Sequence, residues 1–383
     1  MPAAPASSLD DTALRAAIEG CGARFVIDDY GPQAQRESPV VSFERLSSGA
    51  LALLPDHGLI ELTGEERVRF LQALTTNDIE RQPAAQARWH GLCTPKGRLL
   101  ATMLAWREES AIRLLLPRPL AEAVRKRLSM YVLRARVRVD DRSDAHAVLG
   151  LCGAPAGELL ASLGLPAAAP YELASIRTEP GDADAATVIG LPAIGDPAAD
   201  TLPETTTSAP AESRSVQLPR WLLIVPAASL PTLWPRLAQR LAPIDSAAWR
   251  WTDVRSGIAR VVPATVEQFV PQMIDFDSVG GVSFDKGCYP GQEIVARSHY
   301  LGKVKRRLFL GHLAGPPPAP GAAVADANGE PIGAVVLAAP APGGGTDLLL
   351  EAQAAALAEV AQPRIDGHSL RIGTLPYARS DTR

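Results

Sequence analysis

The pattern of apolar and polar positions predicts short strands and helices that alternate irregularly from about residue 50 onward. Strands are expected at Leu51–Leu54 and Leu59–Leu62, on either side of a turn at Pro55–Gly58. An amphipathic helix opens at Thr63–Glu66 and ends in the cluster Thr75–Asp78, whose side chains favour caps and turns. Such a mixture of hairpins and helices is typical of an α+β fold rather than a doubly wound parallel sheet.

The same pattern of short strands and helices continues to residue 260, with one interruption. Further strands are predicted at 87–92, 99–106, 111–116, 135–139, 146–152 and 221–225, and helices at 119–129, 156–163, 230–241 and 249–257. Residues 176–217 are rich in proline, threonine, alanine and aspartate and lose this periodicity. Because such a segment buries too little apolar surface to offset its ordering entropy, we expect a flexible insertion there.

Beyond Gly302 the apolar segments become shorter and are separated by glycine and proline. A strand from Val304 and four shorter ones, around 322–324, 332–337, 348–350 and 369–372, predict a small barrel or sandwich of about 75 residues.

Composition narrows the class of protein. The chain of 383 residues carries 38 basic and 42 acidic residues, so no overall field favours nucleic acid or membranes as partners. Its four cysteines form no C-x-x-C or Cys/His pattern, which indicates free thiols in a reducing cytoplasm and no bound metal. We expect no secretory signal and no spanning helix, because neither a basic segment followed by an apolar core nor 18 consecutive apolar residues occurs.

The candidate chemistry lies in Gly280–Gly302, which contains the run Lys286–Glu293, KGCYPGQE. Its glycines and proline should hold Cys288 on a constrained turn, directly before a short helix at Gln292–Tyr300. A helix N-terminus and the neighbouring Lys286 would both favour the thiolate. The alternative is a structural cysteine in a sharp turn.

Other polar residues allow two interpretations each. Lys286 could activate the thiol or contact an anionic ligand, and Gln292 and Glu293 could bond a heterocycle or simply cap the helix. Arg255 could pair with a ligand carboxylate or interact with the end of its own helix. The basic run Lys303–Arg307 could meet a polyanion such as a polyglutamate chain, or form a solvated face.

The run Lys286–Glu293 resembles the K-G-C-Y-x-G-Q-E signature of the YgfZ family of folate-binding proteins. The surrounding sequence agrees with the family at 75–78, 96–98, 249–258, 271–272, 280–284 and 295–297. The family is related to the glycine-cleavage T protein, an aminomethyltransferase that uses tetrahydrofolate, and mitochondrial relatives act in iron–sulfur cluster assembly. The resemblance implies two intertwined α+β domains around a central folate cavity, followed by a small β-barrel.

The resemblance also implies roles for particular residues. Cys288 becomes the characteristic reactive thiol, and the cofactor, tetrahydrofolate, is expected to contact Arg255, Lys286, Tyr289, Gln292, Glu293 and Arg297. Expected partners are folate and iron–sulfur client or assembly proteins, including the radical enzyme that methylthiolates tRNA, without direct nucleic-acid or membrane contact. The implied division is an N-terminal segment (1–44, partly disordered), two α+β domains (45–145 and 146–260), the signature segment (261–303) and the barrel (304–383).

One departure from the T proteins concerns the reaction. Where those enzymes carry an acidic pair that serves the folate chemistry, this chain has Leu100 and Ala101, which cannot transfer a proton. Together with this departure, the resemblance implies a folate-binding accessory protein for iron–sulfur cluster assembly or repair. The alternatives are a folate-dependent aminomethyltransferase with another substrate, or an interaction scaffold with a vestigial cavity.

Overall fold

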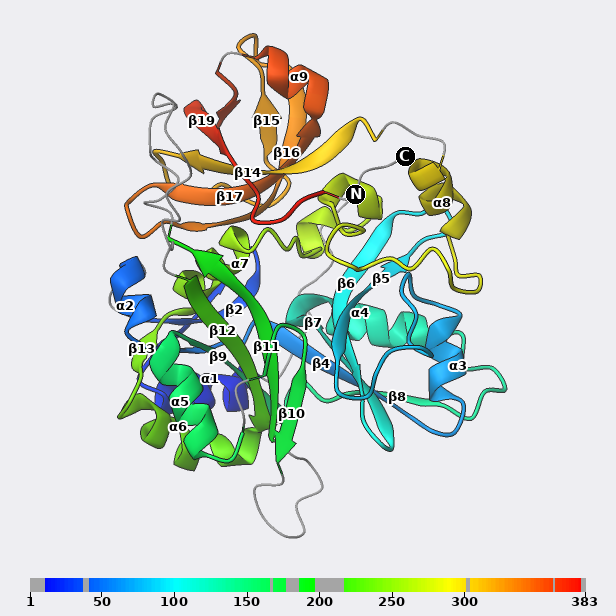
Figure 1. Ribbon diagram of the computed structural model, residues 1–383, viewed down its shortest axis with the longest axis vertical. Coiled ribbons are helices and arrows are strands. Elements are labelled where there is room, and N and C mark those ends of the chain that lie inside the picture. The colour runs from blue at the N-terminus through cyan, green and yellow to red at the C-terminus, as the bar shows by residue number, and fades with distance from the viewer. Residues whose placement is uncertain are drawn as a thin grey trace, which may run out of the picture.

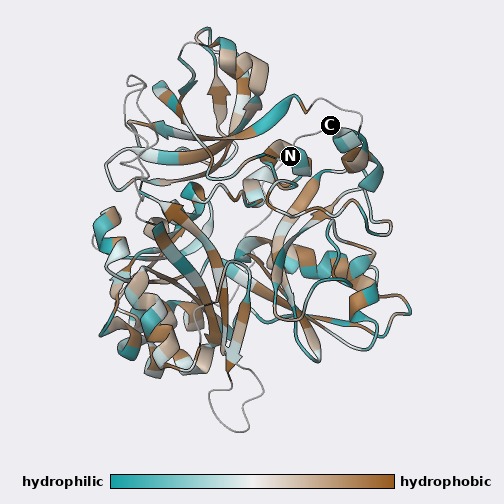
Figure 2. Cartoon of the chain, viewed as in Figure 1, coloured by the Kyte–Doolittle hydropathy of each residue, from teal (hydrophilic) through white to brown (hydrophobic). Residues whose placement is uncertain are grey.

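The computed structural model of the protein describes residues 11–36, 41–165, 168–176, 186–196, 217–300, 304–360 and 362–379. Two units built on sheets and a C-terminal barrel surround a common centre (Figure 1). Figure 2 shows hydrophobic colours concentrated along the strands, whereas both colours alternate along the helices that cover them. No helix of the described ranges is long and apolar enough to cross a membrane.

The first unit is a five-stranded antiparallel sheet in the order β5-β6-β7-β4-β8. Its strands are β4 (His57–Thr63), β5 (Ala87–Cys93), β6 (Leu99–Arg107), β7 (Ala111–Pro117) and β8 (Arg138–Asp141). The short helix α3 (Arg67–Gln72) and the longer α4 (Arg118–Ser129) belong to it. Helix α4 buries Leu120, Val124 and Leu128, which are spaced at helical intervals along one side.

The second unit is a six-stranded sheet in the order β10-β11-β12-β9-β3-β13, of which only the β3–β13 pair is parallel. Its strands are β3 (Ala50–Leu53), β9 (His146–Cys152), β10 (Leu173–Ile176), β11 (Ala186–Gly195), β12 (Gln217–Pro226) and β13 (Ala242–Ile244). Its helices are α1 (Asp11–Gly20), α2 (Phe43–Ser47), α5 (Ala154–Ser162), α6 (Leu230–Ala238) and α7 (Ser246–Arg255). The hairpin of β1 (Arg24–Asp28) and β2 (Gly31–Gln35) packs against α7.

The two units are intertwined, as the family resemblance implies. Strands β3 and β4 are separated by only a short turn, yet β3 pairs with β9 and β13 whereas β4 pairs with β7 and β8. The sequence pattern predicts both strands correctly but suggests a hairpin. They separate because Leu51 and Leu53 pack in the core of the second unit, whereas Leu59 and Ile60 pack in a different core cluster.

The expectation of a flexible insertion over 176–217 is wrong for its middle part. Strand β11 pairs with β10 on one side and β12 on the other. Val188, Ile189 and Ile194 are each at most 1% exposed. Gly190 and Pro192 interrupt the run of apolar residues that marks this strand. The polar, proline-rich sequence on either side therefore led to the prediction of a flexible insertion. The rest of the predicted insertion, 177–185 and 197–216, lies outside the described residues.

The C-terminal unit is a closed barrel, which confirms the predicted β-rich tail. Its strands are β14 (Arg306–Leu313), β15 (Ala323–Ala325), β16 (Pro331–Pro340), β17 (Thr346–Gln353), β18 (Arg364–Ile365) and β19 (His368–Gly373), with helix α9 (Ala354–Glu359) after β17. The barrel packs on α7 through β16 and β17. At this contact the indole Nε1 of Trp251 donates a 2.8 Å hydrogen bond to Asp347.

Candidate functional sites

The signature sequence forms a surface turn followed by helix α8 (Gln292–Tyr300), with the helix bounds predicted from sequence. Cys288 is exposed on this turn, whereas Cys21, Cys93 and Cys152 are buried. Burial raises the pKa of the Cys21 thiol to about 11 and those of Cys93 and Cys152 to about 12. Cys288 is therefore the one thiol of the four that a partner can reach.

Lys286 anchors this turn to the first unit. Its Nζ donates hydrogen bonds of 2.6, 2.5 and 2.9 Å to the backbone carbonyls of Gln72, Thr75 and Asn77, at and just beyond the end of α3. An ammonium group has three donors, so all of them are used. Burial lowers the pKa of Lys286 to about 8, although Asp78 and Glu80 oppose the shift. In this geometry Lys286 positions the turn and does not face an anionic ligand.

Two glycines explain why the turn fits closely against the first unit. Gly291 adopts a φ of +84°, and a Cβ there would lie 2.4 Å from the carbonyl oxygen of Thr94 and 2.7 Å from the Cα of Gly97. Gly97 itself has a φ of +70° and packs against Ile294 of α8. Only residues without a side chain allow these two backbones to approach so closely.

The remaining signature residues divide between buried and exposed positions. Tyr289 is 7% exposed, its ring lies 5.2 Å from Lys286 Nζ, and burial raises its pKa above the usual range. Gln292 is half-buried, whereas Glu293 and Arg297 are exposed. The structure thus brings six of the seven predicted site residues together in one turn and helix.

A separate cavity lies between the two sheets. Its walls include Trp89, Leu104 and Leu115 from the first unit and Leu222 and Trp249 from the second. It encloses about 30 Å³ of free space, which is room for one or two water molecules. No residue of the signature lines this cavity.

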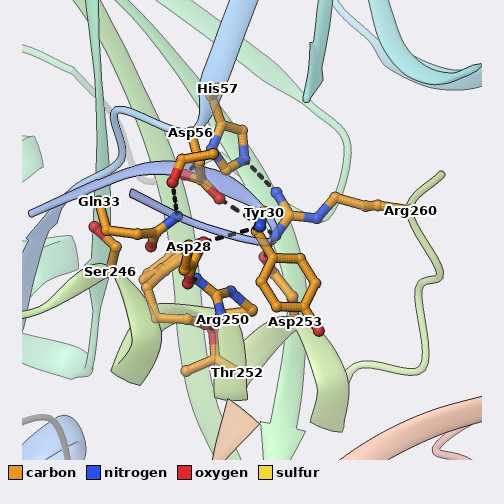
Figure 3. A network of polar contacts seen from close by, with 12 residues as sticks. Asp28, Tyr30, Gln33, Asp56, His57, Ser246, Arg250, Thr252, Asp253 and Arg260 are labelled. Atoms are coloured by element: carbon orange, nitrogen blue, oxygen red, sulfur yellow. Dashed lines mark hydrogen bonds and ion pairs between the residues drawn. The ribbon is translucent and has the colours of Figure 1, made fainter. Parts of the chain in front are cut away.

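A buried network of charged residues borders this cavity (Figure 3). His57 Nδ1 lies 2.9 Å from Asp56 Oδ1, and its Nε2 accepts a hydrogen bond of 3.0 Å from Arg260. Because a guanidinium only donates, the ring proton lies on Nδ1, toward Asp56. Burial opposes ionisation of Asp56, but His57, Arg260 and Arg250 outweigh it and hold its pKa below the usual range. The network therefore keeps the Asp56 carboxylate ionised beside the cavity.

Two donors at this cavity lack a hydrogen-bond acceptor. Nε1 of Trp249 and Nε of Arg260 are buried without a partner in the described part of the chain. Trp249 is held by close packing, since a Cβ at Gly150 would lie 2.5 Å from its ring, and the Arg220 guanidinium lies over the ring at 5.6 Å from its centroid. Buried donors without partners are costly, so the site suits a flat ligand that carries hydrogen-bond acceptors.

An outer pocket of about 370 Å³ adjoins this cavity, and Trp89 lines both spaces. Tyr171 lies in the outer pocket and accepts a 3.2 Å hydrogen bond from the indole of Trp89. Tyr171 has a φ of +64°, an uncommon conformation for a bulky residue. Trp89, hydrogen-bonded to Tyr171, thus stands between the outer pocket and the inner cavity.

Arg255 lies apart from both the signature and this cavity. On α7, Trp249 and Asp253 line the cavity between the sheets, whereas Trp251 and Arg255 face Asp347 of the barrel. Arg255 Nη1 is 3.8 Å from Asp347 Oδ2 and lines a cleft of about 700 Å³ beside the barrel. A folate bound between the sheets would therefore not meet Arg255 in this geometry.

The basic run Lys303–Arg307, whose last two residues begin strand β14, does not form a continuous solvated face. Arg307 is 8% exposed and lies 3.2 Å from Asp275. Arg306 forms a two-pronged ion pair with Glu351 of β17. These arginines attach the barrel strand β14 to its neighbours, and Lys303 lies outside the described residues.

Sequence reasoning missed the residues that border the cavity. His57 begins strand β4, whereas Trp249 on α7 and Arg260 in the loop after that helix come much later in the chain. The helix 249–257 was predicted, but nothing in its pattern tells which of its two tryptophans faces a cavity. An unusual density of arginine around 250–260 is the one available signal.

Comparisons with known proteins agree with this arrangement. The chain is 29% identical over 269 residues to a tRNA-modifying protein YgfZ of Vibrio vulnificus (strain CMCP6), covering 70% of this chain and 71% of that protein. It is 30% identical over 261 residues to a tRNA-modifying protein YgfZ of Yersinia pestis (strain Pestoides F), covering 68% and 69%. The chain belongs to the YgfZ family. No protein-family model matches it.

The fold of this YgfZ-family chain is that of a glycine-cleavage T protein. The aminomethyltransferase T of Bartonella henselae superposes with a TM-score of 0.68 at 17% sequence identity, covering 96% of this chain and 97% of that one. At this identity the similarity concerns the fold alone. It confirms the T-protein-like α+β architecture with a C-terminal barrel that the resemblance implied.

Proposed function

We propose that the protein is a cytoplasmic, tetrahydrofolate-binding accessory protein that supports the assembly or repair of iron–sulfur clusters in client enzymes, including those that methylthiolate tRNA. The observation that carries the proposal is the exposed thiol of Cys288 on an anchored turn with the complete family signature. The proposal has two parts, which can be tested separately.

The folate part rests on the cavity between the sheets. Its apolar walls, the two tryptophans Trp89 and Trp249, and the unpartnered donors of Trp249 and Arg260 suit a pterin ring rich in acceptors. Folate would extend into the outer pocket past Trp89 and Tyr171. Because the inner space is small in the present geometry, binding requires these side chains to move.

The thiol part rests on exposure and rigidity. Lys286 and Gly291 hold the turn against the first unit, so Cys288 is presented at a defined place rather than on a loose loop. A single thiol can bind iron of a cluster in transit or attack a disulfide of a client, which releases one of the client's cysteines as a thiolate, but it cannot hold a cluster stably. Within the described ranges no group of three or more potential ligands could hold a metal ion.

The position of the missing acidic pair favours an accessory protein over a transferase. Leu100 and Ala101 lie on β6, and Ala101 is fully buried. The carboxylate that does line the cavity, Asp253, lies 3.0 Å from Arg220 and 3.4 Å from Arg260. Its carboxylate oxygens are thus engaged by two arginines of the protein rather than left open toward a substrate.

Folate binding is tested by titrating the purified protein with tetrahydrofolate and following tryptophan fluorescence and heat. Trp249→Phe removes one indole donor at the cavity, and we expect about tenfold weaker binding, since one such hydrogen bond contributes about 1.5 kcal/mol. Trp251→Phe is the matched control on the same helix, because its donor faces Asp347 instead. Absence of saturable binding to the unmodified protein would remove the folate part.

The thiol part is tested in a strain that lacks the gene. We expect Cys288→Ser to leave iron–sulfur enzyme activities and tRNA methylthiolation as low as in the deletion strain. Cys21→Ser, which changes a buried thiol, should restore both. Full restoration by Cys288→Ser would show that the thiol has no role.

A further inference from the structure

Exposed large apolar side chains are concentrated in two segments, the turn after α4 in the first unit and the neighbouring helix α8. In the part of the chain that the structure describes, seven such side chains are exposed. Three lie in the turn that follows α4: Met130 (72% exposed), Tyr131 (41%) and Leu133 (87%). Ile294 and Tyr300 of α8 add two more. Isolated exposed apolar residues are ordinary, but a contiguous group indicates an interaction site.

The turn Met130–Leu133 is held in place by its surroundings. Val132, between the exposed residues, packs against the hydrophobic core, as do Ala135 and Val137 just beyond. The backbone amides of Met130 and Tyr131 donate to the carbonyls of Lys126 and Leu128 at the end of α4. The exposed side chains are therefore presented on a structured turn.

Helix α3 connects this turn with the signature. Near its beginning, the backbone amide of Arg136 donates a 2.7 Å hydrogen bond to the Glu66 carboxylate. At its other end, Lys286 binds the carbonyls of Gln72, Thr75 and Asn77. A helix of six residues is about 9 Å long, and Figure 1 places the turn after α4 and helix α8 on the same side of the molecule. The apolar turn and Cys288 are thus attached to the two ends of one short element.

The charged residues around the turn that form no ion pair in the described part of the chain are arginines, so the unpaired charge there is positive. Arg136 and Arg138 form ion pairs with Glu65 and Asp140. Arg127 and Arg134 carry no ion pair or hydrogen bond within the described ranges. A surface that complements this turn therefore has an apolar pocket bordered by acidic side chains.

We propose that the turn Met130–Leu133 is a docking element for the client protein that Cys288 serves, inserting Met130 and Leu133 into an apolar pocket with an acidic rim. The inference rests on the proposed function and assigns it a partner surface. A protein fits better than RNA because the two most exposed side chains are aliphatic, whereas single-stranded RNA is bound by several aromatic rings and many unpaired cations.

The double variant Met130→Ser/Leu133→Ser tests the inference, with Ile27→Ser as the control, because Ile27 is 68% exposed on the distant β1–β2 hairpin. Binding is measured by calorimetry against a purified tRNA-methylthiolating radical enzyme, with tRNA alone as a second probe. We expect at least tenfold weaker binding of the double variant, no change for the control, and unchanged melting temperature and tetrahydrofolate affinity for both. Arg134→Glu should weaken the same binding, and added salt should reduce the difference.

The outcomes separate this inference from the proposed function. If Cys288 is required in the deletion strain but the double variant binds the enzyme and restores activity as the unmodified protein does, the docking element is refuted and the proposed function stands. If the unmodified protein binds tRNA through this turn and not the enzyme, the partner is RNA and the inference is overturned. If Cys288→Ser restores activity fully, the proposed function itself fails.

Discussion

Replacing Gly291 by alanine should loosen the signature turn far more than the same change at Gly287. The new Cβ of Gly291→Ala would lie 2.4 Å from the Thr94 carbonyl oxygen and 2.7 Å from the Gly97 Cα. Both obstacles are backbone atoms, so no side chain can move aside. A left-handed conformation costs an L-residue roughly 1–2 kcal/mol, and overpacking adds roughly 1–3 kcal/mol. We therefore expect a loss of about 2–5 kcal/mol at this contact.

Gly287, the second residue of the motif Lys286–Glu293, is the matched control. No atom lies within 4 Å of a Cβ built there, and its φ is not positive. Gly287→Ala should change stability by no more than about 1 kcal/mol, with stabilisation as the expected sign, because alanine restricts the unfolded chain.

Urea unfolding gives the global free energy, and limited proteolysis within 286–300 reports whether the turn and α8 detach locally. Iron–sulfur enzyme activity in the deletion strain should fall with Gly291→Ala and not with Gly287→Ala. Equal behaviour of the two variants in all three measurements would refute the interpretation that close backbone packing presents the thiol.

Three further predictions concern single residues. In the native protein a soluble disulfide reagent should modify one thiol, at Cys288, and the other three only after unfolding; rapid modification of a second thiol would contradict the burial described. Lys286→Met should make residues 286–300 more sensitive to proteolysis, because it leaves three backbone carbonyls without a donor. Lys286→Arg should increase this sensitivity less. Equal resistance of both variants would argue against a role of Lys286 in anchoring the turn. Asp245, which caps α7 by accepting from the amide of Ala248, has a pKa that burial raises to about 6. Because its folded pKa is above the ordinary value, its contribution to stability falls as pH rises from about 4 to about 6. Asp245→Asn keeps the cap but carries no ionisable group. Its free energy of unfolding, relative to that of the unmodified protein, should therefore increase by roughly 2–3 kcal/mol between pH 4 and pH 7.5. If urea unfolding gives the same difference between the two proteins at both pH values, the prediction is contradicted.

Local patterns were sufficient to predict much of the fold. The bounds of α8 and the existence of β3, β4 and five of the six barrel strands were correct, because side-chain periodicity and turn residues act within a few positions; the two-residue strand β18 was not predicted. Strand β11 was missed because Gly190 and Pro192 interrupt a buried apolar run whose flanks are polar. The pairing of β3 with β9 was also missed, since sheet partners a hundred residues apart leave no mark in a local pattern.

The candidate site shows the same division. Cys288 as the characteristic thiol follows from the signature, but its exposure on the surface does not. Lys286 was interpreted as a partner of the thiol or of an anion, and its target turned out to be the end of a helix more than 200 residues earlier. Arg255 and Trp249 lie on one helix and face different neighbours, which helix periodicity alone leaves undecided without knowledge of what packs on each side.

By itself the sequence determined that the chain is an α+β protein with a β-rich tail and one cysteine set in a glycine-rich turn, because these are properties of short segments. Only the tertiary structure decided which strands share a sheet, that the cavity between the two units is bordered by a buried His57–Arg260 contact, and that Gly291 and Gly97 meet. The physical reason is that each of these features is a contact between distant segments. Such contacts form through close packing and charge neutralisation in a common core, and neither is encoded in the order of neighbouring residues.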